Sequence, residues 1–318
     1  MTTNTASNST SADHVPAANG AAGADPRALL PPSSDGARKL ADGRTLGFGL
    51  YGAGDGPLVV VLDGPGSRGL GRALATEAER LGVTLLVPDR PGFGASTPVG
   101  RRTIPEVAGD LLALVDALGC ERFGLVAQSG GTPYALALAH AAGHRVTGLA
   151  LVGGIVPLGE KDALRDVSGP MRTTFKLARR APWLLKPLIG VVARKTLKDP
   201  AAAARAYAKD LPPLDTKALE DPRMWAIHEV TSAEAVSSPA AFAREARMLA
   251  RPWGFDLEAP RAPVALWVGE QDPVHPPVMS RRLSERLGGA PVTLVPGAAT
   301  FGMNGVYGDV LQHAAALS

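Results

Sequence analysis

The sequence predicts an α/β protein in which helices cover both faces of a mostly parallel β-sheet. Several short segments are apolar at nearly every position, such as PLVVVL at residues 57–62 and VTLLV at residues 83–87. Strands of this kind are buried on both faces, and here they alternate with segments of helical spacing. A third observation is an apolar strand that leads through a tight turn into a helix at residues 123–133. Together these patterns indicate repeated strand–helix–strand units.

The elements of the parallel sheet follow one another in a regular order. Strands are expected at residues 45–51, 57–62, 83–87, 123–127 and 146–152, with helices at residues 70–81, 104–118 and 133–142. The helix from Ile104 has its own start signal, because Thr103 is placed to cap it and Glu106 stands three residues further on. Two late strands, at residues 263–268 and 291–295, complete the pattern, each followed by a helix.

Residues 1–36 are predicted to form a disordered tail. They consist mainly of Thr, Asn, Ser, Ala, Gly and Pro without an apolar period, so they cannot bury enough surface to offset the entropy of ordering. A secretory signal would need a basic start and an apolar stretch of about 7–15 residues, and neither occurs before Arg27. We therefore expect one folded domain, whose core consists of residues 37–154 and 261–318, with residues 155–260 inserted between them.

In the inserted residues 155–260 the strand signal vanishes. Prolines break this Ala-, Lys- and Arg-rich stretch into pieces that we interpret as short helices forming a cap over the sheet. Its first half, residues 165–198, is strongly basic, and Asp166 is the sole acidic residue there. The basic stretch either forms a solvated helix face or attracts an anionic or peptide substrate.

The composition is that of a globular chain and argues against several classes of protein. Of 318 residues, 45% are hydrophobic and 20% charged, and the net charge of +3 is too small to indicate nucleic-acid binding. The single cysteine, Cys120, excludes an intrachain disulfide and a zinc site built from cysteines. No apolar run approaches the roughly 18 residues that suggest a membrane span. We expect a cytoplasmic protein with no metal or other cofactor and no membrane or nucleic-acid partner.

The segment Phe123-Gly-Leu-Val-Ala-Gln-Ser-Gly-Gly-Thr-Pro133 carries the clearest functional signal. Ser129 lies in the turn between strand and helix, which is the setting of a nucleophile elbow that exposes a serine hydroxyl at the carboxyl edge of the sheet. Ala127 and Gly131 provide the small neighbours that this close approach of strand and helix needs. The backbone N–H of Gly130 is then one expected oxyanion donor.

With this elbow the chain resembles the α/β-hydrolase superfamily over nearly everything after Arg44. The other supporting segments are PGSR at residues 65–68, DRPGFGAS at residues 89–96, RPWGFD at residues 251–256 and GEQD at residues 269–272. They are similar to those of actinobacterial single-domain hydrolases with a helical cap. The resemblance implies a mostly parallel, eight-stranded sheet and a pocket between cap and sheet. It implies ester, amide or related acyl chemistry where all catalytic residues are present.

The catalytic set implied by this resemblance is incomplete. Ser129 matches the nucleophile, and Asp272 matches the acid that orients a histidine in such enzymes. The histidine itself normally follows the last strand in a Pro-Gly-x-Gly-His context, but Thr300 occupies the matching position here. Threonine cannot accept a proton near neutral pH, so the serine lacks its expected general base.

Two other histidines are candidates for the missing base. His228 lies in the insertion, where it either hangs over the pocket or is an ordinary cap histidine. His275 follows Asp272 by three residues, in Asp-Pro-Val-His-Pro, and is expected to start the next helix. The remaining histidines fall in the tail, at the far end of the elbow helix or on the terminal helix.

The loop after residues 57–62 is expected to supply the second oxyanion donor. Related hydrolases have His-Gly-x-Pro-Gly there, and this chain has Leu-Asp-Gly-Pro-Gly. Matching from Pro65 onward places the backbone N–H of Gly64 in the donor position, whereas matching from Asp63 would place Pro65 there, which has no N–H. Asp63 itself either supports the turn or acts as a carboxylate base near Ser129.

Two further side chains are assigned to the same region. Arg68 pairs either with a substrate carboxylate or with an acid on the protein surface, and Phe93 either lines the pocket or packs in the core.

The sequence thus predicts an enzyme that acts on a small-molecule or peptidic acyl substrate by a nonstandard mechanism. In this hypothesis Ser129, Gly64 and Gly130 bind or polarise a carbonyl, while Asp272 or Asp63 handles protons. Because the Ser-His-Asp set is incomplete, one alternative is proton transfer without hydrolysis, such as epimerisation or cyclisation in natural-product biosynthesis. The other alternative is a catalytically inactive binding protein. The fold alone does not choose among them.

Overall fold

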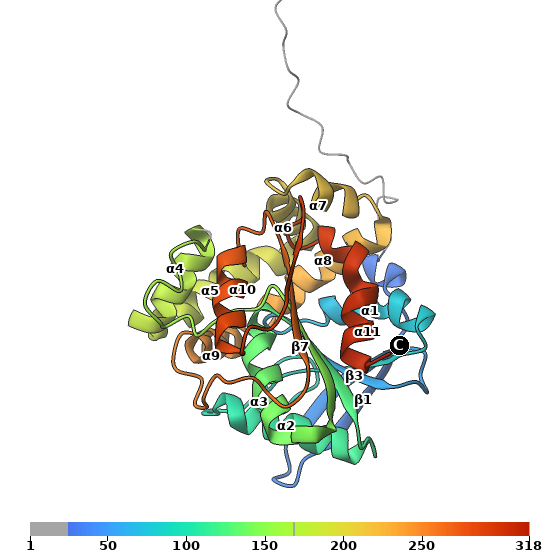
Figure 1. Ribbon diagram of the computed structural model, residues 1–318. Coiled ribbons are helices and arrows are strands. Elements are labelled where there is room, and N and C mark those ends of the chain that lie inside the picture. Colours follow the sequence, from blue (N-terminus) through green and yellow to red (C-terminus); the bar gives the residue numbers. More distant parts are fainter. Residues whose placement is uncertain (1–24, 168, 318) are drawn as a thin grey trace, which may run out of the picture.

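A computed structural model describes residues 25–167 and 169–317 and contains one eight-stranded sheet, in the order β1-β2-β4-β3-β5-β6-β7-β8 (Figure 1). The strands are β1 (Ser34–Lys39), β2 (Thr45–Gly52), β3 (Leu58–Leu62), β4 (Thr84–Pro88), β5 (Phe123–Gln128), β6 (Val146–Val152), β7 (Val264–Gly269) and β8 (Val292–Val295). Strand β2 is antiparallel to both of its neighbours, and all the other pairs are parallel. The predicted fold class and the mostly parallel sheet are confirmed.

Helices pack on both faces of this sheet. The helices are α1 (Gly69–Arg80), α2 (Ile104–Ala117), α3 (Thr132–Ala142), α4 (Gly169–Arg180), α5 (Pro182–Lys198), α6 (Pro200–Ala208), α7 (Pro213–Ala218), α8 (Pro222–Val236), α9 (Pro239–Leu249), α10 (Pro277–Arg286) and α11 (Tyr307–Ala315). Helices α2, α3 and α10 bury their apolar side chains on one face with Val60 and Leu62 of β3, and α1 and α11 pack on the other with Val59 and Val61. Successive strand residues point to opposite faces, which is why β3 is apolar at every position.

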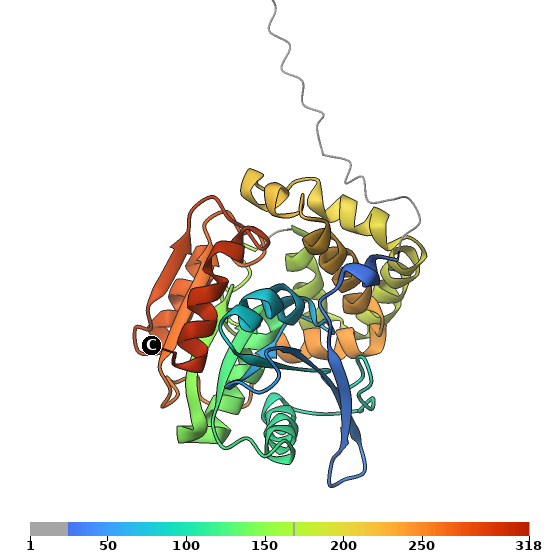
Figure 2. The ribbon, with the colours of Figure 1, turned by 90° about the vertical axis from the view of Figure 1, so that its right-hand side faces the viewer.

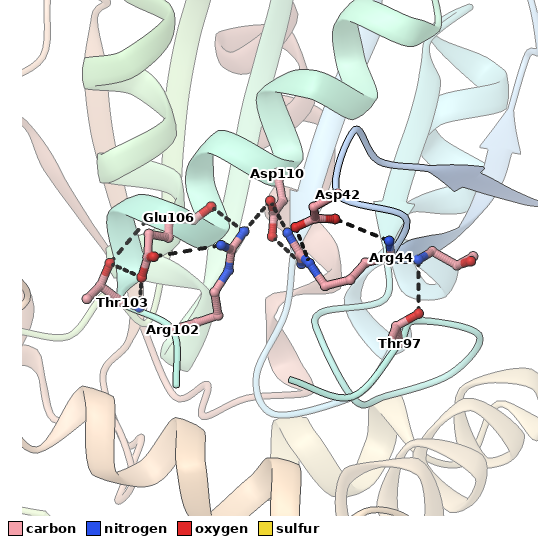
Figure 3. A network of polar contacts seen from close by, with 8 residues as sticks. Asp42, Arg44, Thr97, Arg102, Thr103, Glu106 and Asp110 are labelled. Carbon is pink, nitrogen blue, oxygen red and sulfur yellow. Dashed lines mark hydrogen bonds and ion pairs between the residues drawn. The ribbon is translucent and has the colours of Figure 1, made fainter. Parts of the chain in front are cut away.

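The start of α2 follows the capping pattern predicted from the sequence. Thr103 accepts a hydrogen bond from the backbone N–H of Glu106 through its hydroxyl, and its own N–H donates to the Glu106 carboxylate at 2.7 Å. Figure 3 shows this box beside Arg102, which together with Arg44 binds the Asp110 carboxylate. The network ties α2 to the beginning of β2.

The structure differs from the expectation of a disordered segment through residue 36. A short 3₁₀ helix, η1 (Pro26–Leu29), lies against α8, and β1 pairs with β2 along its whole length (Figure 2). β1 is largely exposed, so backbone hydrogen bonds rather than apolar side chains hold it, and its sequence carries no period that predicts a strand. Residues 1–24 of the expected tail lie outside the described residues.

Helices α4 to α9 all fall between β6 and β7, in the helical insertion of residues 155–260, and Figure 2 shows them gathered towards the top of the molecule. Among the described residues three ion pairs join this insertion to the sheet domain, and two of them involve its helices. Arg90 binds Glu245 of α9 at 2.7 Å with both side chains buried, and Arg72 binds Glu234 of α8 at 2.7 Å. A buried pair is costly to break because the remaining charge would be left unpaired.

Candidate active site

Ser129 lies in a strained turn between β5 and α3. It is one of three described residues other than glycine with a positive φ, at 51°, a backbone conformation that L-residues adopt only when the surrounding structure imposes it. The chain can turn so tightly because Gly131 has no side chain: a Cβ atom there would lie 1.9 Å from the carbonyl oxygen of Leu62. These features are those of a nucleophile elbow.

A cavity of about 390 Å³ lies over Ser129. The sheet domain contributes side chains from the loops after β3, β5, β7 and β8, and the helical insertion contributes residues of α4, α5, α6 and α8. Asp63 is the only Asp, Glu, Lys or Arg among the described residues that line the cavity. The size suits a small molecule, and the lining favours an uncharged one.

Asp272 and His275 form a buried pair in the loop after β7. The ring Nδ1 of His275 lies 3.0 Å from Oδ2 of Asp272, and the other carboxylate oxygen accepts the backbone N–H groups of Val274 and His275 at 2.8 Å each. Helix α10 begins only at Pro277, so His275 is not part of that helix, contrary to the expectation from the sequence. A tight turn, closed by the carboxylate, folds the imidazole back onto the acid.

The environment of Asp272 favours its charged form. Burial acts to raise the pKa of this carboxyl, but the charge and ring hydrogen bond of His275, together with the two backbone N–H donors, outweigh burial and hold the pKa below its ordinary value. An ionised carboxylate is the state needed to orient a neighbouring imidazole and to stabilise its protonated form.

The second ring nitrogen of His275 is available for chemistry. Nε2 is buried without a hydrogen-bond partner among the described residues, and His275 lines the same cavity as Ser129. The ring lies against Gly153, where a Cβ would approach ring atoms to 3.0–3.1 Å. Gly153 follows β6, which runs between β5 with Ser129 and β7 with Asp272. His275 therefore sits over the middle one of three adjacent strand ends.

In the described part of the chain, no hydrogen bond joins the Ser129 hydroxyl to His275. Such contacts are often long in proteins without substrate and tighten when substrate binds. A sequence signal for His275 existed in the two prolines that follow it, because Pro277 at the first helical position leaves the preceding residues in a turn beside the acid.

Thr300 lies beside the same acid but contributes no base. Its hydroxyl is 3.4 Å from Oδ2 of Asp272, in the loop after β8, and its side chain lines the cavity. Tyr207 of the insertion lies nearby. Partial burial of the phenol and the nearby Asp272 carboxylate raise the pKa of Tyr207, so the phenol is protonated near neutral pH.

Sequence reasoning missed Asp215, which anchors the Thr300 loop from the insertion. Asp215 lies on α7 and is fully buried, and its two carboxylate oxygens accept the backbone N–H groups of Ala299 and Phe301 at 2.6 Å each. No local pattern could have revealed this contact, because 84 residues separate Asp215 from its first partner.

Asp63 is fixed by hydrogen bonds within its own loop. Its Oδ2 accepts the Ser67 hydroxyl at 2.6 Å and the Leu70 N–H at 2.9 Å, and its Oδ1 accepts the Gly64 N–H at 2.6 Å. The carboxylate thus supports the turn, which is one of the two predicted roles, while it also lines the cavity. The Gly64 N–H, predicted to be an oxyanion donor, is already engaged. Gly130, the other predicted donor, lies next to this loop, since a Cβ there would be 3.9 Å from the Cα of Gly64.

Two other candidates, Arg68 and Phe93, have different environments. Arg68 donates to both carboxylate oxygens of Asp89 at 2.7 and 2.8 Å and to Asp35 at 2.7 Å, so it is paired within the protein and not available for a substrate carboxylate. Phe93 is 2% exposed and lies outside the cavity lining, so of its two predicted roles packing is the observed one.

His228 lines the cavity, which is one of its two predicted positions, and its ring is already engaged. Nε2 lies 3.1 Å from the carbonyl oxygen of Ala204, and Phe301 stands with its ring centroid 4.7 Å away. Burial lowers the pKa of His228, although the Ala204 carbonyl acts in the opposite direction. The ring is therefore neutral near pH 7 and packs as part of the cavity wall.

Comparison with protein families places these features in a known context. A model of the alpha/beta hydrolase fold matches residues 56–302. The chain belongs to the α/β-hydrolase fold family. A comparison with curated protein sequences finds no significant match.

Solved structures similar to this α/β-hydrolase show the same fold at low identity. An alpha/beta hydrolase fold protein from Nakamurella multipartita is 25% identical, with a TM-score of 0.62 over 89% of this chain and 98% of its own. A thermophilic esterase from Thermogutta terrifontis is 22% identical, with a TM-score of 0.61 over 88% and 96%. Epoxide hydrolase A from Mycobacterium thermoresistibile is 18% identical, with a TM-score of 0.62 over 88% and 98%.

Within the described residues this α/β-hydrolase has no cluster of three or more His, Cys, Asp or Glu side chains suited to a metal ion. None of its described helices is both long and apolar enough to cross a membrane. The groups that this chain places at the cavity include a strained serine hydroxyl, the Asp63 carboxylate and an imidazole paired to the Asp272 carboxylate.

Proposed function

We propose that this α/β-hydrolase is a serine hydrolase that cleaves a small, uncharged acyl substrate of the ester or amide type. Ser129 is the nucleophile, His275 is the general base, and Asp272 orients the histidine. The observation that carries the proposal is the Asp272–His275 pair, whose free ring nitrogen is buried in the wall of the cavity that contains Ser129. His275 thereby replaces the histidine that the family has where this chain has Thr300.

The reaction follows from these roles. The Ser129 oxygen attacks the carbonyl carbon while Nε2 of His275 takes the hydroxyl proton, and the ionised Asp272 stabilises the imidazolium that forms. When the bond to the leaving group breaks, His275 gives that proton to the leaving alcohol or amine. A water molecule then attacks the acyl-enzyme with the same proton transfers, which releases the acid and restores Ser129.

The oxyanion that forms during attack needs hydrogen-bond donors. The N–H of Gly130 is one donor in the proposal. The N–H of Gly64 becomes the second donor when the Asp63 carboxylate rotates away from it and breaks their present 2.6 Å hydrogen bond. Arg90 supports this arrangement, because it donates to the carbonyl oxygen of Asp63 at 2.9 Å and keeps the loop in place.

Labelling with a serine-reactive fluorophosphonate tests the proposal. Wild-type protein should be labelled at Ser129, Ser129→Ala should not be labelled, and His275→Gln should react far more slowly. His228→Gln is the matched control, because His228 lines the same cavity but is bonded to Ala204, so it should be labelled at close to the wild-type rate. If labelling survives in His275→Gln at the wild-type rate, His275 is not the base. If only the Thr300→His variant had esterase activity, the site would need a histidine at the position where the family ordinarily has it.

A second candidate is proton transfer beside a carbonyl without hydrolysis, as in an epimerase or cyclase of natural-product biosynthesis. The engaged Gly64 N–H favours it, because a carboxylate bonded to the second donor opposes a developing oxyanion. The cavity also holds both Asp63 and His275, which are suited to take and return a proton. Deuterium uptake from heavy water into a peptide or ester offered as substrate, without cleavage, would support this candidate. Absence of both labelling and exchange would support a binding protein.

A further inference from the structure

Helix α5 presents an apolar face to solvent. Its buried residues, Leu185, Ile189, Ala193 and Thr196, recur at helical spacing and form the inward side. The outward side carries large apolar residues of which Trp183 is 71% exposed and Val191 55% exposed. The other exposed apolar residues of this helix are Leu184, Leu188, Val192 and Leu197. A helix at the surface of a soluble protein ordinarily places polar residues there.

Basic residues lie on both sides of this apolar face, which consists of the exposed apolar residues between 183 and 192, and the exposed Lys186 lies between them in the sequence. Before it, Arg179 and Arg180 end α4, and after it the exposed Arg194, Lys195 and Lys198 occupy the last turns of α5. Residues 167–198 contain no Asp or Glu, and Asp199 is the first acid that follows. In Figure 1 α4 and α5 lie at the left-hand side of the molecule.

We propose that the outward face of α5 binds the surface of an anionic lipid membrane. Trp183 and its apolar neighbours would enter the boundary between headgroups and acyl chains, while the flanking Arg and Lys side chains would lie among anionic headgroups. Helices that lie in the plane of a membrane surface combine an apolar face carrying Trp or Leu with Lys and Arg in this way. A contact of this kind lies at the membrane surface and needs no spanning segment.

Charge argues for a membrane over a second copy of the chain. In a symmetric dimer through α5, whichever way the two helices run, each basic end would face a basic end of the other copy. No acidic side chain between residues 167 and 198 is available to neutralise that contact. An anionic bilayer supplies both the apolar layer and the negative charge.

The proposed membrane-binding helices also border the cavity over Ser129. Met171 of α4 and Thr196 of α5 belong to the lining of the cavity over Ser129, so the proposed membrane-binding helices are also part of its wall. An apolar substrate dissolved in the bilayer would then be delivered to the wall of the site. The membrane contact does not depend on the proposed hydrolysis, and it is measured separately from activity.

Vesicle co-sedimentation of the full chain tests the inference. The protein should sediment with vesicles of phosphatidylcholine and phosphatidylglycerol in equal parts and should remain in solution with phosphatidylcholine alone. High salt should weaken the binding, because it screens the charges near the surface. Tryptophan fluorescence should shift to shorter wavelength on binding, and the shift should become smaller in Trp183→Phe.

Two pairs of variants separate the apolar and the electrostatic contributions. Trp183→Ser/Leu188→Ser and Lys195→Glu/Lys198→Glu should each reduce partitioning onto the anionic vesicles by about tenfold or more. Leu294→Ser and Lys39→Glu, both exposed residues distant in sequence from α5, are matched controls and should bind as the wild type does. The far-ultraviolet circular dichroism spectrum and the urea midpoint should stay unchanged in the α5 variants, which shows that they fold.

The inference is overturned by three results. The first is absence of binding to anionic vesicles. The second is binding that the α5 variants leave unchanged. The third is burial of Trp183 in a concentration-dependent dimer or in a complex with an acidic protein, when vesicles do not bury it.

Discussion

Two neighbouring loops at the carboxyl edge of the sheet, one after β7 and one after β8, differ in what they bring to the site. The loop after β8 is the one in which related hydrolases keep the catalytic histidine, and here it carries Thr300, 3.4 Å from Asp272. The loop after β7 carries both the acid and a histidine, with Nδ1 of His275 at 3.0 Å from Asp272. A general base must lie close to the Ser129 hydroxyl in space, and a side chain from more than one loop can occupy that position.

The two loops are also held in different ways. The loop after β7 is closed by its own contacts, since Asp272 accepts two backbone N–H groups and the ring of a residue three positions away. The loop after β8 depends on a distant helix, because its backbone N–H groups at Ala299 and Phe301 donate to Asp215 of α7. The local sequence is enough to specify the short-range turn after β7. The conformation of the loop after β8, in contrast, forms only after the insertion has packed against the sheet domain.

The largest effect is expected from His275→Gln. Glutamine keeps the approximate size and polarity but cannot take a proton, so kcat/KM for a short-chain aryl ester should fall by about 10⁴–10⁶-fold, the range of losses seen when a triad member is removed. Ser129→Ala is the control, because it removes the nucleophile and should lose activity at least as completely. If the variant retained the wild-type rate, the general base would be another residue, and the loop after β7 would not have taken over the role of the loop after β8.

Asp215→Ala tests the long-range anchor of the second loop. It would leave two buried N–H groups without an acceptor, which costs about 2–4 kcal/mol in the free energy of unfolding. Urea denaturation followed by circular dichroism measures this loss. Asp221→Ala is the control, because Asp221 caps α8 at the exposed surface and accepts one N–H, so its loss should be about 1 kcal/mol. Equal losses in both variants would mean that Asp215 is not a special anchor.

The acid of the first loop should make stability depend on pH. Because the folded-state pKa of Asp272 lies below its ordinary value of 3.8, the unfolded state binds the proton more readily. The stabilisation is fully present above 3.8 and is lost as the pH falls through the lower folded-state value. Urea midpoints at neutral and acidic pH should therefore show a smaller acid-induced loss in Asp272→Asn than in the wild type. Asp55→Asn, at an exposed position, should behave as the wild type, and an identical acid loss in both variants would refute the assignment.

The smallest effect is expected from Thr300→Val. This substitution removes one hydroxyl that lies 3.4 Å from the Asp272 carboxylate and leaves the volume of the side chain nearly unchanged. The loss corresponds to one weak hydrogen bond, about 0.5–1.5 kcal/mol, and so to a change in kcat/KM of about tenfold or less. Steady-state kinetics with the same ester measure it beside His275→Gln. A loss as large as that of His275→Gln would assign the chemistry to Thr300 and reverse the comparison.

Local patterns in the sequence determined most of the sheet and the position of Ser129. The strands of the parallel part are apolar on both faces because two helix layers bury them, and that regularity is visible without the structure. The elbow was equally visible, because the small residues Ala127 and Gly131 flank Ser129 between an apolar strand and a helix. The capping box of α2 depends on Thr103 and Glu106, three residues apart. In each case one short stretch of chain contains both the cause and the result.

The tertiary structure alone decided how the site is completed. Whether Arg68 meets a substrate or Asp89, and whether the loop that carries Thr300 reaches Asp215, depend on which groups the fold brings within reach. The same holds for β1, a polar strand that exists because β2 pairs with it. Hydrogen bonds and ion pairs act over a few ångströms in space regardless of separation along the chain, so the sequence names the groups and the fold chooses the partners.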